Sequence, residues 1–130
     1  MSPALLEVHA MNVWWGPAQA VFEASIRLQP GEAVAILGRN GAGKSSWLMG
    51  LAGWTRHDAT VFELGGESVL RWPAHQRARA GLALVPQDRR IFTHLSVLEN
   101  LRMGLHARGP RPRHTPSFEM DEVLDLFEAL

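Results

Sequence analysis

The 130-residue chain contains no cysteine, no excess of charge of either sign and no long apolar run. Without cysteine there is no disulfide framework and no thiol chemistry. Thirteen basic residues balance thirteen acidic ones, so no global field favours a nucleic-acid backbone. The apolar runs are far shorter than the roughly 18 residues that a membrane-spanning helix needs. We therefore expect local recognition of partners and no nucleic-acid ligand.

The remaining composition is that of a folded domain. Hydrophobic residues make up 46% of the chain and charged residues 20%, which is ordinary for a protein with a packed core. The N-terminal residues lack the basic segment followed by an apolar one that marks a secretory signal. We expect a cytoplasmic protein, either soluble or docked on a partner.

The most specific feature is the run Gly-Arg-Asn-Gly-Ala-Gly-Lys-Ser-Ser at positions 38–46. Its spacing G-x-x-x-x-G-K-[ST] is that of a phosphate-binding loop and is met by Gly38, Gly43, Lys44 and Ser45. Glycines let successive backbone N–H groups turn towards one centre, and a following helix adds the positive end of its dipole. Lys44 is predicted to reach the β- and γ-phosphates, and the Ser45 hydroxyl to bind the bridging Mg²⁺.

The alternative interpretation of this run is a glycine-rich turn in which Lys44 is only a solvated charge. Its context argues against that. Residues 33–37 before the loop form the continuous apolar run expected of a strand buried on both faces, and residues 45–52 after it have helical character. Lys44 is also the only lysine among thirteen basic residues, and a narrow phosphate pocket suits an ammonium better than a planar guanidinium.

The residues before the loop predict two antiparallel strands. They cover residues 5–15 and 21–28 and are separated by the turn Gly16-Pro17. The side chains expected to face the core are Leu6, Val8, Ala10, Ala24, Ile26 and Leu28.

The helix after the loop is expected to bury Leu48, Leu51 and Ala52, with Trp47 on its flank and Gly53 at its end. Residues 54–59 read as a connection. Gly65-Gly66 then predicts a hairpin between residues 60–64 and 67–70. Residues 74–80 favour a short polar helix that exposes Gln76, Arg77 and Arg79, and residues 82–85 a second buried strand.

The last part of the chain predicts two more helices. Ser96 and Glu99 have the spacing of a capping box, which starts a helix over residues 97–106. A proline-rich loop is expected over residues 107–117, and an apolar stripe with period 3.6 begins at Glu119. This stripe stops at Leu130 without a helix-ending signal, so we expect the chain to be part of a longer protein.

Three motifs together resemble the ATP-binding subunit of ABC transporters. They are the loop at 38–46, the step Val85-Pro86-Gln87 about forty residues later, and Trp15-Gly16 near the start. The resemblance spans essentially the whole chain. It implies an α/β fold, with a P-loop NTPase-type core and an antiparallel β subdomain.

The resemblance also assigns roles to individual residues. It implies that Trp15 stacks on adenine, with Trp14 as the next candidate, and that Gln87 approaches the Mg²⁺ and the attacking water. The alternative for Trp15 is a ring that holds a strand end in the core. The residues implied to bind nucleotide are Trp15, Gly38, Asn40, Gly41, Ala42, Gly43, Lys44, Ser45 and Ser46, with Ser45 and Gln87 at the Mg²⁺.

Within the family, residues 87–101 are similar to the branch that imports branched-chain amino acids, urea or amides. Asp88 and Thr93 stand where that branch often has Gly and Pro. Membership would imply transmembrane permease subunits and a second ATP-binding subunit as partners. It would also imply a peripheral location on the cytoplasmic face of the membrane.

Three motifs of the family do not occur in these 130 residues. They are the Leu-Ser-Gly-Gly-Gln signature, the apolar strand that ends in Asp-Glu, and the switch histidine. Asp121-Glu122 does not replace the second, because it lies at a predicted helix start. We therefore expect residues 1–130 to be a partial nucleotide-binding domain that binds Mg-ATP weakly at best and does not hydrolyse it.

Two other functions are compatible with a phosphate loop. The chain could be a non-hydrolysing nucleotide-binding or interaction module whose exposed sheet edge pairs with a partner. It could also be an unrelated P-loop kinase or GTPase. The guanine-binding pattern Asn-Lys-x-Asp is excluded, because Lys44 is the only lysine.

Overall fold

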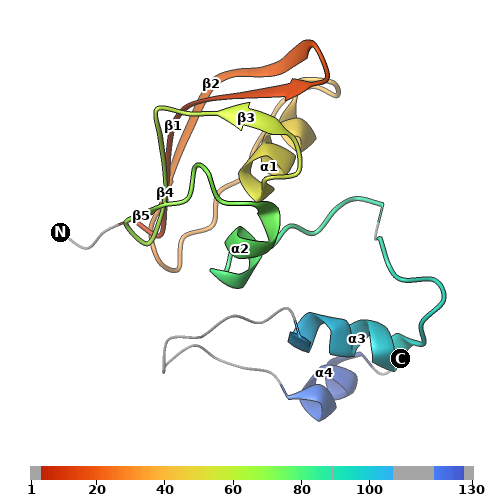
Figure 1. The fold of residues 1–130 in the computed structure, drawn as a ribbon. Coiled ribbons are helices and arrows are strands. Elements are labelled where there is room, and N and C mark those ends of the chain that lie inside the picture. The colour runs from red at the N-terminus through yellow and green to blue at the C-terminus, as the bar shows by residue number, and fades with distance from the viewer. Residues whose placement is uncertain (1–3, 89, 107–118, 128–130) are drawn as a thin grey trace. The chain divides into compact units, whose positions relative to one another are not determined.

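The computed structural model describes residues 4–88, 90–106 and 119–127. The chain divides into two compact units, Met1–Leu84 and Val85–Leu130. Among the described residues, the first unit holds a sheet and two helices, and the second holds two further helices (Figure 1). No helix in the described ranges is long and apolar enough to cross a membrane.

The sheet of the first unit is built on β1 (Leu6–Trp15). β2 (Ala18–Leu28) and β4 (Val61–Leu64) pair with it antiparallel, β5 (Glu67–Ser68) pairs with β4, and the order is β2-β1-β4-β5. These strands confirm the two predicted hairpins. β3 (Arg56–Asp58) also pairs with β1, within the stretch expected to be a connection. The hydrophobic pattern did not predict β3, because all three of its residues are polar.

A bulge in β1 changes which side chains reach the core. Ala10 has φ 49°, and the pairing with β2 shifts register between Val8 and Met11. Because an extra residue moves later side chains to the other face, Met11 and Val13 are fully buried. The expectation that Ala10 faces the core is wrong.

Helix α1 (Lys44–Ala52) packs on this sheet (Figure 1). Trp47 and Leu51 join a core that also holds Val8, Val13 and Phe62. The predicted helix and its end at Gly53, which is left-handed at φ 80°, are confirmed. Leu51 and Ala52 are buried as predicted, but Trp47 is buried in place of Leu48, which remains 39% exposed.

The strands predicted over residues 33–37 and 82–85 do not form. Val34 is 50% exposed, Leu37 89% and Val85 91%, whereas Ile36 and Leu82 pack against the core. A strand needs a neighbour for its backbone N–H and C=O groups. Within the described ranges no strand pairs with either stretch, so both stay extended without a ladder.

In the second unit, α3 (Val97–His106) starts as predicted. The Ser96 N–H donates to Glu99 Oε2 at 2.8 Å, and the Glu99 N–H donates back to Ser96 Oγ at 3.3 Å. The predicted capping box is therefore confirmed. The pKa of the Glu99 carboxyl is lowered first by the backbone N–H of Ser96 and then by the Ser96 hydroxyl, which donates to Glu99 Oε2 at 2.7 Å.

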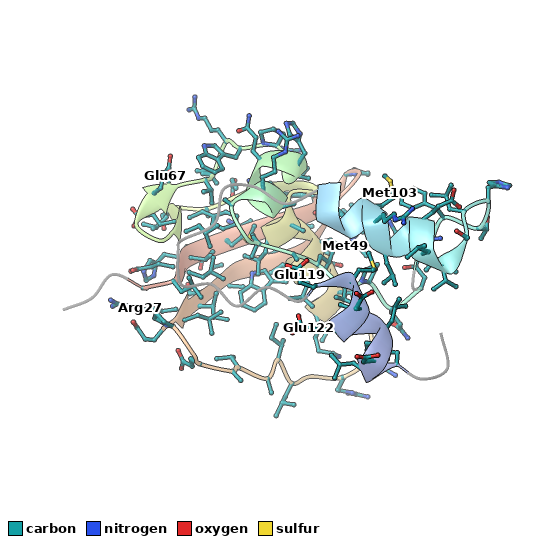
Figure 2. All side chains as sticks on the ribbon, turned by 90° about the horizontal axis from the view of Figure 1, so that it is seen from below. Arg27, Met49, Glu67, Met103, Glu119 and Glu122 are labelled. Atoms are coloured by element: carbon teal, nitrogen blue, oxygen red, sulfur yellow. The ribbon has the colours of Figure 1, made fainter. Side chains whose placement is uncertain are left out.

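The last described helix, α4 (Met120–Leu126), has a capping box that the sequence analysis missed. The Glu119 N–H donates to Glu122 Oε2 at 2.7 Å. Figure 2 labels both residues where this helix begins. Val123 and Leu124 are half-buried, whereas Phe127 is 58% exposed at the helix end and not on a packed stripe. The predicted proline-rich loop and Leu130 lie outside the described residues.

The contact between α1 and β1 leads to a first prediction. A Cβ on Gly50 would lie 2.6 Å from Val13 Cγ2 and 3.3 Å from Met11 Cε. We expect Gly50→Ala to lower the free energy of unfolding by about 1–3 kcal/mol, because a short branched side chain cannot move aside. Gly104→Ala in α3 is the control, since its Cβ meets nothing within 4 Å and should stabilise by up to about 1 kcal/mol. Urea unfolding measures the free energy of unfolding of both variants, and equal changes would contradict the close packing of Gly50 on Val13.

The capping box of α3 gives a second prediction. The pKa of Glu99 lies below its ordinary value in the folded chain, so the cap is intact at neutral pH and weakens as pH falls through that lowered pKa. Ser96→Ala should raise the pKa of Glu99 part of the way towards its ordinary value, because the hydroxyl no longer donates to Glu99 Oε2 while the backbone N–H of residue 96 still does. NMR titration of the carboxyl carbons tests this, with Ser68→Ala as control. An unchanged pKa in Ser96→Ala would refute the assignment.

Candidate phosphate-binding site

The loop at residues 38–43 takes its shape from two left-handed glycines. Gly41 has φ 83° and Gly43 has φ 90°, and the Ala42 N–H donates to the Arg39 carbonyl at 3.1 Å. The loop ends where α1 begins, at Lys44. The first backbone N–H groups of a helix have no partner within the helix, so this end of α1 can bind an anion.

Gly43 is also required because the loop passes close to the backbone of β2. A Cβ at this position would lie 2.6 Å from the Ala20 carbonyl oxygen of β2. Backbone cannot move aside as a flexible side chain can, so only glycine fits here. The loop is thereby held directly against the β1–β2 hairpin.

The side chain of Lys44 lies across its own loop. Its Nζ donates to the Gly38 carbonyl at 2.7 Å and to the Arg39 carbonyl at 2.8 Å, and the residue is half-buried. An ammonium has three N–H donors, so a third is left for an anion. This geometry argues against the solvated-charge interpretation and is suited to holding phosphate.

Trp15 lies beside this loop. Its indole Nε1 donates to Ser46 Oγ, in the first turn of α1, at 3.0 Å. The ring is 51% exposed, so it does not fill the core and has surface left to contact a ligand. Trp14 is held differently, with the Arg56 guanidinium over its ring at 5.0 Å. Of the two candidate tryptophans, the structure brings Trp15 to the loop.

Gln87 belongs to the second unit, where it is an exposed residue in a turn after Pro86. All the other residues predicted to bind nucleotide lie in the first unit. The described residues contain no group of three or more His, Asp or Glu side chains that could hold a metal. The exposed Ser45 hydroxyl still suits Mg²⁺, which takes most of its oxygen ligands from water and phosphate.

The prediction that Arg77 of α2 (Ala74–Arg79) lies at the surface is wrong. Arg77 is 0% exposed. Its Nε donates to the Val69 carbonyl at 3.2 Å, and its Nη1 donates to the Gly50 and Leu51 carbonyls at 3.1 and 3.0 Å. Those last two carbonyls belong to the C-terminal turn of α1, where a cation is favoured.

The far side of the Arg77 guanidinium is also occupied. Its Nη2 donates to the Leu70 carbonyl at 2.8 Å and lies 2.7 Å from His57 Nε2. The guanidinium carbon stands 4.6 Å from the centre of the Phe62 ring. Burial lowers the pKa of Arg77. No sequence pattern marks this residue, because Arg79 in the same short helix looks equivalent.

A family model described as "ABC transporter" matches residues 21–129. The branched-chain amino acid transport ATP-binding protein BraG of Pseudomonas aeruginosa is 34% identical over 97% of this chain and 53% of its own length. The phosphonates import ATP-binding protein PhnC of Stutzerimonas stutzeri is 34% identical over 92% and 46%. The lipopolysaccharide export system ATP-binding protein LptB of Haemophilus influenzae is 32% identical over 84% and 45%.

The chain therefore belongs to the ABC transporter family and corresponds to part of its ATP-binding component. It spans about half the length of the curated relatives it matches. Membership confirms the α/β class expected from the three motifs, and the structure contains the predicted antiparallel sheet.

Arg77 provides a third prediction. Arg77→Ala should lower the free energy of unfolding by about 3 kcal/mol or more, because several buried carbonyls lose a charged donor together. Arg77→Lys should recover only part of this, since an ammonium cannot reproduce the planar fork. Arg79→Ala, on the exposed side of α2, should stay within about 0.5 kcal/mol. Equal losses of unfolding free energy in Arg77→Ala and Arg79→Ala, measured by chemical unfolding, would contradict the role of the Arg77 hydrogen bonds.

Proposed function

We propose that this chain binds Mg-ATP at residues 38–46, as the N-terminal part of the ATP-binding component of a transporter. One observation carries the proposal: Trp15, the implied adenine platform, is hydrogen-bonded to Ser46 beside the phosphate loop, although 31 positions separate the two residues. A surface for the base and a loop for the phosphates therefore occur side by side in one unit.

Each part of the site has a separate task in this proposal. The backbone N–H groups of the loop and Lys44 hold the phosphates, and the Ser45 hydroxyl is a ligand of the Mg²⁺. The exposed face of Trp15 stacks on adenine. Gln87 is proposed to have the role that the family resemblance implies, which is to position the water and the Mg²⁺. When bound, Mg²⁺ neutralises phosphate charge that this loop neutralises only in part.

Hydrolysis of ATP is proposed for the whole transporter protein and not for these 130 residues alone. The family's signature motif, catalytic carboxylate strand and switch histidine do not occur in the sequence given. Losing one preorganised electrostatic group commonly costs about 10²- to 10³-fold in rate. Residues 1–130 are therefore proposed to bind nucleotide without measurable turnover.

The proposed partners are transmembrane permease subunits and a second ATP-binding subunit, on the cytoplasmic face of the membrane. The relatives named above concern branched-chain amino acids, phosphonates and lipopolysaccharide. We propose solute import, of branched-chain amino acids, urea or amides. The support is the similarity of residues 87–101 to that branch and the likeness to BraG.

A second candidate is a non-hydrolysing nucleotide-binding or interaction module. The exposure of Val34 and Leu37 favours it, because apolar side chains gathered at a surface commonly mark a contact with protein. The two candidates differ in whether the whole protein hydrolyses ATP. ATP hydrolysis by residues 1–130 alone that disappears in Lys44→Ala would exclude the module and would also contradict the absence of turnover proposed above.

The loop provides the fourth prediction. Lys44→Ala should weaken Mg-ATP binding by about tenfold or more, because a charge-assisted contact to phosphate is lost. Isothermal titration calorimetry on the full chain measures the dissociation constant. Arg79→Ala removes an exposed positive charge elsewhere in the same unit and should leave the dissociation constant unchanged. Binding that is insensitive to Lys44→Ala would overturn the proposed function.

A further inference from the structure

Two side chains from different elements meet at the edge of the phosphate loop. Trp15 is the last residue of β1, and Ser46 lies in the first turn of α1. The indole Nε1 donates to Ser46 Oγ at 3.0 Å. Trp15 is 51% exposed and Ser46 is half-buried, so both can reach a ligand bound at this edge.

The chemistry of the two groups gives this hydrogen bond a direction. An indole N–H can only donate, whereas a hydroxyl has one proton to donate and two lone pairs to accept. Ser46 Oγ therefore accepts from Trp15 and keeps its own proton for another acceptor. Hydrogen bonds in a chain polarise one another, so a hydroxyl that accepts at its oxygen becomes a stronger donor.

The position of Ser46 indicates which acceptor this proton meets. The first turn of α1 carries unpaired backbone N–H groups and the positive end of the helix dipole. Lys44, the first residue of α1, adds an ammonium that donates to the Gly38 and Arg39 carbonyls. An anionic oxygen is the acceptor that this environment favours.

We propose that Trp15 and Ser46 form a relay from the base platform to the phosphates. In the relay, the Trp15 N–H donates to Ser46 Oγ, and the Ser46 hydroxyl donates to a phosphate oxygen in the loop. The relay rests on the proposed nucleotide binding and adds a coupling between the base contact and the phosphate contact. Trp15 then acts on phosphate affinity although its ring contacts only the base.

The relay also has a consequence for the base. The hydrogen bond restrains rotation of the indole before any ligand arrives, so less ordering entropy is lost on binding. The ring is held at the edge of the loop, with half of its surface open. Phosphate on the Ser46 hydroxyl fixes that side chain and, through it, the ring. Base and phosphates are therefore bound cooperatively.

The fifth prediction tests the relay by a double-mutant cycle on the full chain. Trp15→Phe keeps an aromatic ring but removes the N–H donor, and Ser46→Ala removes the hydroxyl. Each single variant should weaken Mg-ATP binding about 3- to 10-fold, as expected for one hydrogen bond. The double variant should bind Mg-ATP no more weakly than the single variant with the lower affinity, because each substitution alone already removes the relay. Effects that multiply in the double variant would overturn the relay.

A ligand without a base makes the test sharper. Inorganic tripolyphosphate offers phosphate oxygens but nothing for Trp15 to stack on. Trp15→Phe should still weaken its binding about threefold, and Ser46→Ala should cancel that difference. Unchanged tripolyphosphate affinity in Trp15→Phe would show that the ring acts on the base alone, which contradicts the relay.

Two further variants separate failure of the relay from failure of the proposed function. Ser68→Ala removes an exposed hydroxyl from β5 and should bind Mg-ATP as the parent chain does. Lys44→Ala should bind at least tenfold more weakly. If Lys44→Ala weakens Mg-ATP binding but the effects of Trp15→Phe and Ser46→Ala multiply in the double variant, the relay is overturned and the proposed function is not. Binding that is absent, or insensitive to Lys44→Ala, overturns both.

Discussion

The buried guanidinium of Arg77 is the interaction on which the first unit depends. A charge removed from water is costly unless hydrogen bonds replace its hydration. Here they come from backbone carbonyls of two segments, Gly50 and Leu51 at the end of α1 and Val69 and Leu70 after β5. The same group therefore holds α1 at its C-terminal end and the chain that leads into α2.

Once α1 is held, its other end determines the geometry of the loop. Gly50 packs against Val13 in the last turn of the helix, and Gly43 passes beside the Ala20 carbonyl where the helix begins. Neither position has room for a side chain. The β1–β2 hairpin, which ends at Trp15, therefore lies against the phosphate loop, and the proposed base and phosphate contacts come from one packed interface.

Much of the fold and the site was predictable from local pattern. The loop at 38–46, the α1 helix, the two hairpins and the capping box at Ser96 each depend on residues close in sequence, and each was found. The buried Arg77, strand β3 and the Ala10 bulge were missed, since all three depend on partners far along the chain. Residues 33–37 were wrongly read as a strand, because hydrophobicity cannot show whether a neighbouring strand is present.

The sequence by itself determined the type of chemistry: a glycine-rich loop with one lysine, followed by a helix, is suited to phosphate because backbone N–H groups and an ammonium converge on one centre. Only the tertiary structure decided which tryptophan stands beside that loop. Trp14 and Trp15 are neighbours in an aromatic pair that composition cannot resolve. The packing of α1 on the hairpin separates them, because side chains alternate along a strand and only Trp15 reaches Ser46.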